Sequence, residues 1–242
     1  MSIVELRQYT LRPGARDELI GLFEAELLEP QENCGMHILG TFRDLDDDCR
    51  FVWLRGFADM ATRTEALRRF YGGPDWKRHR DAANATMVDS DDVLLLRPAW
   101  EGSGFMQVAE PVAAADGDDR GIVIATIVEL DDAADLGFFR DEIAPAVDAR
   151  GGALLGCLVT EHSPNGFPAL PVREDVNVVA WLTGHPGRAR AEVDVAQCAI
   201  ASACAGWPGA AGPARSLRLQ PTRRSRLTSA PPTAARAGAV SR

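Results

Sequence analysis

Apolar and polar residues alternate along several short stretches of the chain, and segments with helical spacing separate these stretches. In the first half the alternation predicts four strands, at residues 2–11, 36–43, 51–57 and 92–97. Apolar residues between them recur at helical spacing, as Leu19, Phe23 and Leu27 do. This spacing predicts helices at residues 15–33, 60–70 and 77–84. The first half therefore has the element order β-α-β-β-α-β, with the last two predicted helices filling one helical position.

The same pattern recurs about 120 residues later in the chain. Residues 3–11 are matched by 122–130, residues 35–40 by 151–156, and residues 94–98 by 217–221. The second copy predicts strands at 121–130, 152–161, 175–183 and 215–221, and helices at about 133–149 and 186–204. The repeat indicates two similar units in one chain.

The element order of each unit is that of a ferredoxin-like fold, whose antiparallel sheet carries its helices on one face. The other face of each sheet would be bare unless the two sheets pack together. We therefore predict an α+β fold in which two tandem ferredoxin-like units, residues 1–100 and 121–227, form a pseudo-symmetric α/β barrel. The intervening residues 101–120, rich in Gly, Ala and Asp, are predicted to be a linker, and residues 228–242 to be disordered.

Composition and charge exclude several classes of partner. The net charge is -9, and the last 35 residues contain seven arginines and no acid, so residues 1–207 carry 19 basic and 35 acidic groups. An acidic body argues against a nucleic-acid partner, and the Arg-rich end is expected to pair with the chain's own acidic surface. The longest apolar runs are too short to span a membrane. Five cysteines without metal-ligand spacing predict reduced thiols, no metal site and a cytoplasmic location.

Glu5, Arg7 and Tyr9 alternate along the first strand and share one of its faces, while Val4 and Leu6 lie on the other. We expect Val4 and Leu6 to face the helices, and therefore the charged set to face the barrel interior. In the catalytic interpretation, Arg7 holds a carboxylate or oxyanion, Tyr9 donates to it, and Glu5 orients Arg7 or acts as a base. In the alternative, Glu5 and Arg7 form a structural ion pair that closes the barrel.

The third strand presents a second set of candidates on one face, namely Phe51, Trp53, Arg55 and Phe57. We expect these residues and Trp181 of the second unit to line the barrel interior as a substrate-binding surface. An arginine among aromatic rings can hold a planar anion by stacking and charge. In the alternative, the aromatic rings fill the interior and Arg55 extends its charge to the barrel mouth.

His37 in the second strand is a further candidate, as a general base or as a haem ligand, with a purely structural histidine as the alternative. The second unit lacks the polar set, because Ile124, Thr126 and Val128 stand where the first unit has Glu5, Arg7 and Tyr9. This asymmetry predicts a pocket with one polar and one apolar wall, suited to an amphipathic small molecule. In the alternative, the second unit is a scaffold.

The chain resembles the NIPSNAP family in four places along its length. The matching segments are residues 5–14 (ELRQYTLRPG), residues 35–36 (GM) with 40–43 (GTFR), residues 74–76 (PDW), and Pro221 and Thr222 with Ser225 and Leu227. The resemblance implies the dimeric α/β-barrel superfamily, whose members include cofactor-free monooxygenases, polyketide cyclases and haem enzymes. The family usually has Trp at the position of Arg55, and the second unit keeps it as Trp181.

These observations lead to one functional hypothesis and two alternatives. We expect a cofactor-independent enzyme of the oxygenase, cyclase or isomerase type, because no nucleotide, serine-hydrolase or zinc-protease motif is present. Its predicted catalytic residues are Tyr9, Arg7, Glu5 and His37. The alternatives are a non-catalytic binding or scaffold protein and a haem-binding barrel. A small molecule is the expected partner, with homo-oligomer formation possible and no membrane partner.

Overall fold

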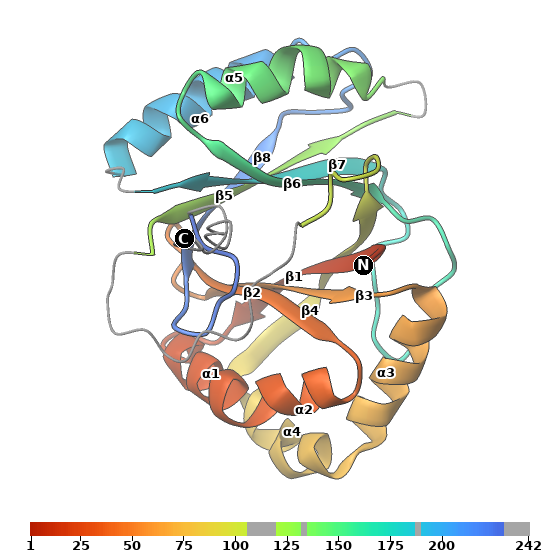
Figure 1. Cartoon of the computed structure of the whole chain (residues 1–242). Coiled ribbons are helices and arrows are strands. Elements are labelled where there is room, and N and C mark those ends of the chain that lie inside the picture. The colour runs from red at the N-terminus through yellow and green to blue at the C-terminus, as the bar shows by residue number, and fades with distance from the viewer. Residues whose placement is uncertain (106–119, 132–134, 187–189, 230–242) are drawn as a thin grey trace, which may run out of the picture.

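The computed structural model describes residues 1–105, 120–131, 135–186 and 190–229 of the chain (Figure 1). Most of the predicted linker and nearly all of the predicted C-terminal tail lie outside these described residues. Figure 1 shows two helical layers on opposite sides of a central group of strands. In the described part of the chain, no helix is long and apolar enough to cross a membrane.

The first half contains the predicted elements with small shifts of their ends. They are β1 (Ile3–Leu11), α1 (Arg16–Leu22), the π-helical turn η1 (Phe23–Leu27), α2 (Leu28–Asn33), β2 (His37–Asp44), β3 (Arg50–Phe57), α3 (Met60–Gly72), α4 (Pro74–Thr86) and β4 (Met87–Pro98). Asp59 caps α3 by accepting a hydrogen bond from the backbone N–H of Thr62 at 2.7 Å. Pro74 starts α4, where a missing N–H is harmless. Strand β4 begins five residues before the predicted position.

The second half repeats this order with a shorter helical layer. Its elements are β5 (Ile122–Glu129), the π-helical turn η2 (Phe139–Ile143), α5 (Ala144–Asp148), β6 (Ala153–Thr160), β7 (Val178–His185), α6 (Arg190–Cys204) and β8 (Arg215–Pro221). The link between β6 and β7 is 17 residues long, whereas β2 and β3 are joined by five. That long link crosses to the first half, as described below.

The eight strands close into an antiparallel barrel in the order β1-β3-β2-β8-β5-β7-β6-β4. The predicted closed α/β barrel within one chain is thereby confirmed. The first and third strands of each half pair in a similar way: Glu5 pairs with Arg55 in the first half, and Ile124 pairs with Thr183 in the second. The seams between the halves are narrower, since β2 pairs with β8 and β4 with β6 through three residue pairs each.

Aliphatic side chains fill the barrel interior. They include Val4 and Leu6 of β1, Val52 and Leu54 of β3, Leu94 and Leu96 of β4, and Val123, Leu182 and Leu219 of the second half. The prediction that Val4 and Leu6 face the helices is therefore wrong. Two sheets packed face to face leave room for branched aliphatic side chains, whereas charges need polar partners that the closed interior does not offer.

The polar and aromatic set lies on the opposite face, under the helices of the first half. The predictions that Glu5, Arg7 and Tyr9 line the barrel interior, and that Phe51, Trp53, Arg55 and Phe57 do, are wrong for this reason. The aromatic members pack with Leu19, Phe23, Leu67 and Phe70 of the helices. Trp181 likewise lies under the helices of the second half, beside Phe139.

Register also corrects one equivalence between the halves. Trp53 pairs with Arg7, and Trp181 pairs with Thr126, which is the counterpart of Arg7. Trp181 is therefore the counterpart of Trp53, and Thr183 is that of Arg55. The expectation that Trp181 occupies the position of Arg55 is therefore wrong by two residues.

The Arg-rich segment after β8 returns to the first half, as expected from its charge. Arg224 pairs with Glu29, and Arg226 pairs with Glu32. The backbone N–H of Leu227 donates to the carbonyl of Leu39 at 2.8 Å. The basic segment thus neutralises acidic groups of the first helical layer and closes one end of the barrel.

Candidate functional site

Three arginines surround the carboxylate of Glu5 between the sheet and the helices of the first half. Arg7 Nη1 lies 2.7 Å from Oε2, Arg55 Nε lies 2.8 Å from Oε2, and Arg63 Nε lies 2.6 Å from Oε1. Arg7 comes from β1, Arg55 from β3 and Arg63 from α3. All four side chains are fully buried. We call Glu5, Arg7, Arg55 and Arg63 the arginine cluster.

The electrostatics of the arginine cluster keep Glu5 ionised. Burial by itself raises the pKa of Glu5, but the charges of the three arginines outweigh it and hold the pKa well below its ordinary value. Burial lowers the pKa of Arg63, while its contact with Glu5 acts in the opposite direction. A carboxylate so strongly stabilised as an anion is a weak base. Glu5 therefore orients arginines and is unsuited to proton abstraction.

Aromatic rings solvate two of the three arginines. The guanidinium carbon of Arg55 lies 5.1 Å from the ring centroid of Trp53, 5.7 Å from that of Phe57 and 6.0 Å from that of Tyr71. Arg7 lies 5.4 Å from the centroid of Tyr9 and 5.5 Å from that of Trp53. These distances are typical of cation–π contacts, which partly replace the hydration lost on burial.

The arginine cluster still carries more donors than acceptors. One carboxylate against three guanidinium groups leaves two positive charges in excess. Within the described part of the chain, the Nη2 atoms of Arg7, Arg55 and Arg63 are buried and have no hydrogen-bond partner. Buried polar groups are normally paired, so three such donors in one place mark a site that lacks acceptors.

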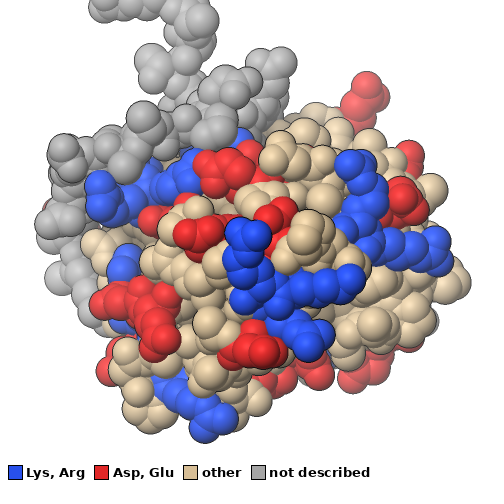
Figure 2. Space-filling model, turned by 90° about the horizontal axis from the view of Figure 1, so that it is seen from below, with Lys and Arg blue, Asp and Glu red and all other residues tan. Residues whose placement is uncertain are grey.

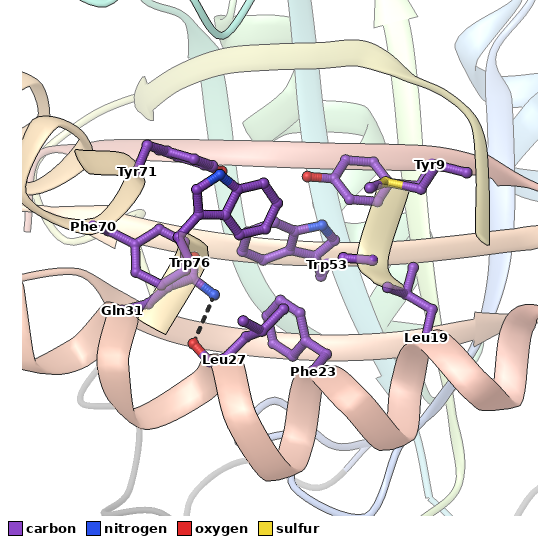
Figure 3. Close-up of a pocket in the computed structure, with 11 residues that line it drawn as sticks. Tyr9, Leu19, Phe23, Leu27, Gln31, Trp53, Phe70, Tyr71 and Trp76 are labelled. Carbon is purple, nitrogen blue, oxygen red and sulfur yellow. Dashed lines mark hydrogen bonds between the residues drawn. The ribbon is translucent and has the colours of Figure 1, made fainter. Parts of the chain in front are cut away.

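A small aromatic pocket lies next to the arginine cluster, with a volume of about 30 Å³ (Figure 3). Its lining side chains are Tyr9, Leu19, Phe23, Leu27, Gln31, Trp53, Phe70, Tyr71, Trp76, Ala83 and Met87. Figure 3 shows the hydroxyl of Tyr9 directed into the pocket, toward the side of Trp76 and Tyr71. Arg7 Nε donates to that hydroxyl at 3.1 Å, which leaves its proton available to another acceptor. The buried Nε1 of Trp53 has no acceptor among the described residues.

Gln31 connects the aromatic pocket to the arginine cluster. Its Nε2 donates to the carbonyl of Leu27 at 3.1 Å, the contact dashed in Figure 3. Its Oε1 accepts from Arg55 Nη1 at 3.1 Å, and the sulfur of Met36 lies 3.5 Å from the same nitrogen. An amide oxygen and a thioether are weak acceptors for a cation. Arg55 is thus poorly satisfied on the side that faces the pocket.

The link between β6 and β7 of the second half covers this site. Asn165 Oδ1 accepts from Arg63 Nη1 at 2.9 Å. Phe167 stacks on Tyr71 with ring centroids 5.9 Å apart. Leu170 and Val172 pack on the same apolar cluster of the first half. Links longer than about 12–15 residues within compact domains are often functional lids.

The structure brings together most of the residues singled out in the sequence. Glu5, Arg7, Tyr9, Trp53 and Arg55 meet at one place, although not in the barrel interior. The flanking rings are Phe51, which contacts Tyr9 and Phe23, and Phe57, which contacts Arg55.

Two residues expected at the site lie elsewhere. His37 is exposed at the start of β2 and does not line the pocket. This placement corrects its assignment to a site shared with Glu5, Arg7 and Tyr9. Trp181 packs with Phe139 and Trp207 in the other half.

The sequence analysis missed Arg63, Gln31, Tyr71 and Asn165. Arg63 had a detectable signal, because it precedes Leu67 and Phe70 at helical spacing and so lies on the apolar face of α3. An arginine on that face must have a buried partner. Asn165 lies in an irregular loop, where no periodicity could reveal its contact with Arg63.

Larger hollows exist on the surface, and they differ in character from the aromatic pocket. One hollow of about 520 Å³ lies at a barrel mouth. Its lining includes Leu94, Ile127, Val178, Arg173 and Arg215. It is open to solvent, and its arginines already contact Glu129 and Asp92. On the helical face seen in Figure 2, basic and acidic side chains are interspersed. Buried donors without acceptors also occur at Trp181 Nε1 and Gln8 Nε2. What distinguishes this site among the described residues is that three arginine donors of this kind belong to one cluster beside an aromatic pocket.

Solved structures with this fold cover both halves of the chain. A candidate monooxygenase from Lactobacillus acidophilus NCFM aligns over 94% of this chain and 98% of its own, with 12% identity and a TM-score of 0.55. A candidate monooxygenase from Fusobacterium nucleatum subsp. nucleatum aligns over 90% and 91%, with 9% identity and a TM-score of 0.53. At such low identity these likenesses show the fold alone.

The matches to NIPSNAP proteins concern the first half of the chain. A NIPSNAP domain protein from Burkholderia xenovorans aligns over 41% of this chain and 96% of its own, with 18% identity and a TM-score of 0.38. No curated protein matches the chain at a significant level. The NIPSNAP family model matches residues 4–100, which contain β1 to β4 and the whole arginine cluster. Residues 4–100 of the chain are therefore a NIPSNAP domain.

Proposed function

We propose that the NIPSNAP domain binds a small amphipathic organic molecule between its sheet and its helices. The observation that carries this proposal is the aromatic pocket, in which the N–H of Trp53 has no acceptor among the described residues and the hydroxyl of Tyr9 only accepts, from Arg7 Nε. Apolar walls with a few convergent donors are typical of sites for small organic ligands. The donors favour a ligand that presents an acceptor oxygen, such as a carbonyl, phenol or enolate.

The size of the pocket limits how such a ligand enters. A volume of about 30 Å³ holds about two or three water molecules, since each needs about 10–15 Å³ measured in this way. An aromatic ligand therefore requires the covering elements to move. The link between β6 and β7 is the element suited to this, because it lies over Tyr71 and Arg63 without belonging to a helix or strand.

We further propose that the bound molecule is converted by a cofactor-independent reaction of the oxygenase, cyclase or isomerase type. Tyr9, with Arg7 behind it, can donate to an oxygen that becomes negative in the transition state. The names of the two structural neighbours, both candidate monooxygenases, agree with the oxygenase version. Glu5 positions Arg7 in this scheme and takes no proton.

The filled barrel interior favours a second candidate, a non-catalytic scaffold. Twenty buried apolar residues pack in the interior, and the hollow of about 520 Å³ at the barrel mouth reaches only Leu94, Ile127 and Val178 among them. In this version the arginine cluster is a structural tie between β1, β3 and α3. The two candidates differ in whether the aromatic pocket takes a ligand.

Binding of phenol and 1-naphthol, measured by calorimetry, separates them. We expect 1-naphthol to bind and Tyr9→Phe to weaken it by about 2–10-fold, because one neutral hydrogen bond contributes roughly 0.5–1.5 kcal/mol. Trp53→Phe should weaken it similarly, whereas Trp181→Phe, the equivalent change in the other half, should not. Equal effects of the two tryptophan variants, or no binding to the wild type, would favour the scaffold.

We also infer that each half is a ferredoxin-like unit, so that residues 1–100 and 121–227 are tandem copies of one architecture. The strand order supports this, because it reads β4-β1-β3-β2 in the first half and β8-β5-β7-β6 in the second. A cytoplasmic location remains part of this proposal, supported by five cysteines that are free thiols. Expression of residues 121–227 alone, tested for cooperative unfolding, would show whether the second unit folds by itself.

A further inference from the structure

We infer that Arg7, Arg55 and Arg63 form a subsite for the carboxylate of a small aromatic acid, an inference that rests on ligand binding in the aromatic pocket. The first argument is charge. Two positive charges in excess are buried around Glu5, and a monoanion would halve that excess. Isolated buried charges are strongly unfavourable, so the arginine cluster favours an anionic partner.

The second argument is hydrogen bonding. All three guanidinium groups donate to the one carboxylate of Glu5, and each keeps a buried Nη2 without an acceptor among the described residues. Guanidinium groups match the planar carboxylate, which accepts two parallel N–H bonds. A carboxylate oxygen is also a better acceptor for Arg55 than the amide of Gln31 that now serves it.

The third argument is the position of Gln31 at the boundary. It lines the aromatic pocket and at the same time holds Arg55, so displacement of its amide would join the pocket to the arginine cluster. A ligand with its ring against Trp53 and Tyr71 would then place its carboxylate where the Gln31 amide now lies. The ligand class is therefore an aromatic ring bearing a carboxylate on a short link.

A monocarboxylate fits this subsite better than a phosphate. Two excess charges would be balanced by one dianion or two monoanions, so the charge count alone does not choose between the two, and the choice depends on space and desolvation. A dianionic phosphate needs more acceptor space and more desolvation than a site beside a cavity of about 30 Å³ provides. Phosphate is therefore the anion that tests whether the subsite prefers a carboxylate to other anions.

The experiment compares sodium benzoate, benzamide, benzyl alcohol and sodium phosphate by calorimetry with the full chain, at pH 7 and constant ionic strength. We expect benzoate to bind about tenfold more tightly than benzamide, because hydrogen bonds to a charged acceptor contribute more binding free energy than those to a neutral one. Arg63→Met should reduce this ratio to about one. Arg68→Met, an exposed position on the same helix, is the matched control and should preserve it.

Each result decides between the two proposals. If benzoate, benzamide and benzyl alcohol bind equally, the aromatic pocket stands and the carboxylate subsite is overturned. If phosphate competes with benzoate at equal concentration, the assignment to a carboxylate is overturned. If no aromatic compound binds, the proposed function fails together with the subsite that rests on it.

Variants of the arginine cluster could also fail by unfolding. Urea denaturation of each variant checks this, and Arg63→Lys provides a second probe that keeps the charge but removes the free Nη2 donor. We expect Arg63→Lys to fold and to lose most of the preference for benzoate over benzamide. A folded Arg63→Lys protein that keeps the full preference overturns the subsite.

Discussion

Glu5→Gln is the most informative single substitution, because Glu5 is the acceptor that all three buried arginines share. The carboxylate accepts from Arg7 at 2.7 Å, from Arg55 at 2.8 Å and from Arg63 at 2.6 Å. Glutamine keeps the shape of the side chain and one acceptor oxygen. Its amide group, however, turns two N–H donors toward guanidinium groups that are themselves only donors.

The expected loss in the free energy of unfolding of Glu5→Gln follows from these contacts. One amide oxygen can replace part of the set, so about two of the three charge-assisted bonds are lost, at roughly 1.5–3 kcal/mol each. The resulting 3–6 kcal/mol agrees with the roughly 3–5 kcal/mol expected when a buried ion pair loses one partner. Full burial of the arginine cluster means that solvent does not screen this loss. In a protein of this size the melting temperature should fall by about 6–24 °C.

The free energy of unfolding is measured by urea denaturation at pH 7, followed by tryptophan fluorescence and far-ultraviolet circular dichroism. Glu65→Gln is the matched control, since Glu65 is exposed on α3 close to Arg63 in sequence. We expect a change within about 0.5 kcal/mol for this control. A loss below about 1 kcal/mol in Glu5→Gln would refute the view that the arginine cluster depends on this carboxylate.

Three further predictions concern other properties of the chain. Because the pKa of Glu5 is held below its ordinary value, its stabilising contribution is complete above about pH 4.3 and is lost as the pH falls through the lowered pKa. Denaturation of the wild type between pH 5 and pH 2 should therefore show a steeper loss than that of Glu5→Gln. Burial raises the pKa of Cys157 to about 12, so a thiol reagent at pH 8 should modify exposed Cys198 first, and equal rates would contradict the packing. A Cβ at Gly184 would clash with the backbone carbonyl oxygen of Ser229, so Gly184→Ala should release the C-terminal segment, detectable as faster tryptic cleavage after residue 226.

The sequence predicts which residues share a face of a strand. It does not predict which face points into the barrel and which lies under the helices. Alternation along β1 shows that Glu5 and Arg7 share a face and that Val4 and Leu6 share the other. Both faces of this strand are buried, one in the barrel and one under helices, so burial does not distinguish them. We assigned the charged face to the interior because apolar residues suit a helix contact. Narrow sheet-to-sheet packing instead selects the aliphatic face.

The residues of the arginine cluster that lie on strands can be predicted from the sequence. The residue on a helix, Arg63, can be predicted only in part. Glu5, Arg7 and Arg55 lie on neighbouring strands, and their proximity follows from pairing of β1 with β3. Arg63 belongs to a helix, whose rotation about its axis is set by packing that the strand pattern does not contain. Asn165 reaches the cluster only because the barrel closes, which places a loop of the second half over the first.

The two halves have divided their roles in a way that a symmetric pair of identical chains could not. At equivalent positions the first half has Glu5 and Arg55, and the second has Ile124 and Thr183, so charge is kept on one side only. The second half instead carries the long link with Asn165, which completes the polar contacts of Arg63. In identical chains each copy would carry both features, and every arginine cluster would need its own cover. Because the cover comes from the other half, residues 1–100 alone would leave the outer side of the cluster in water. Its three arginines would then be hydrated, and the aromatic pocket would lose the dry environment that makes their charge effective.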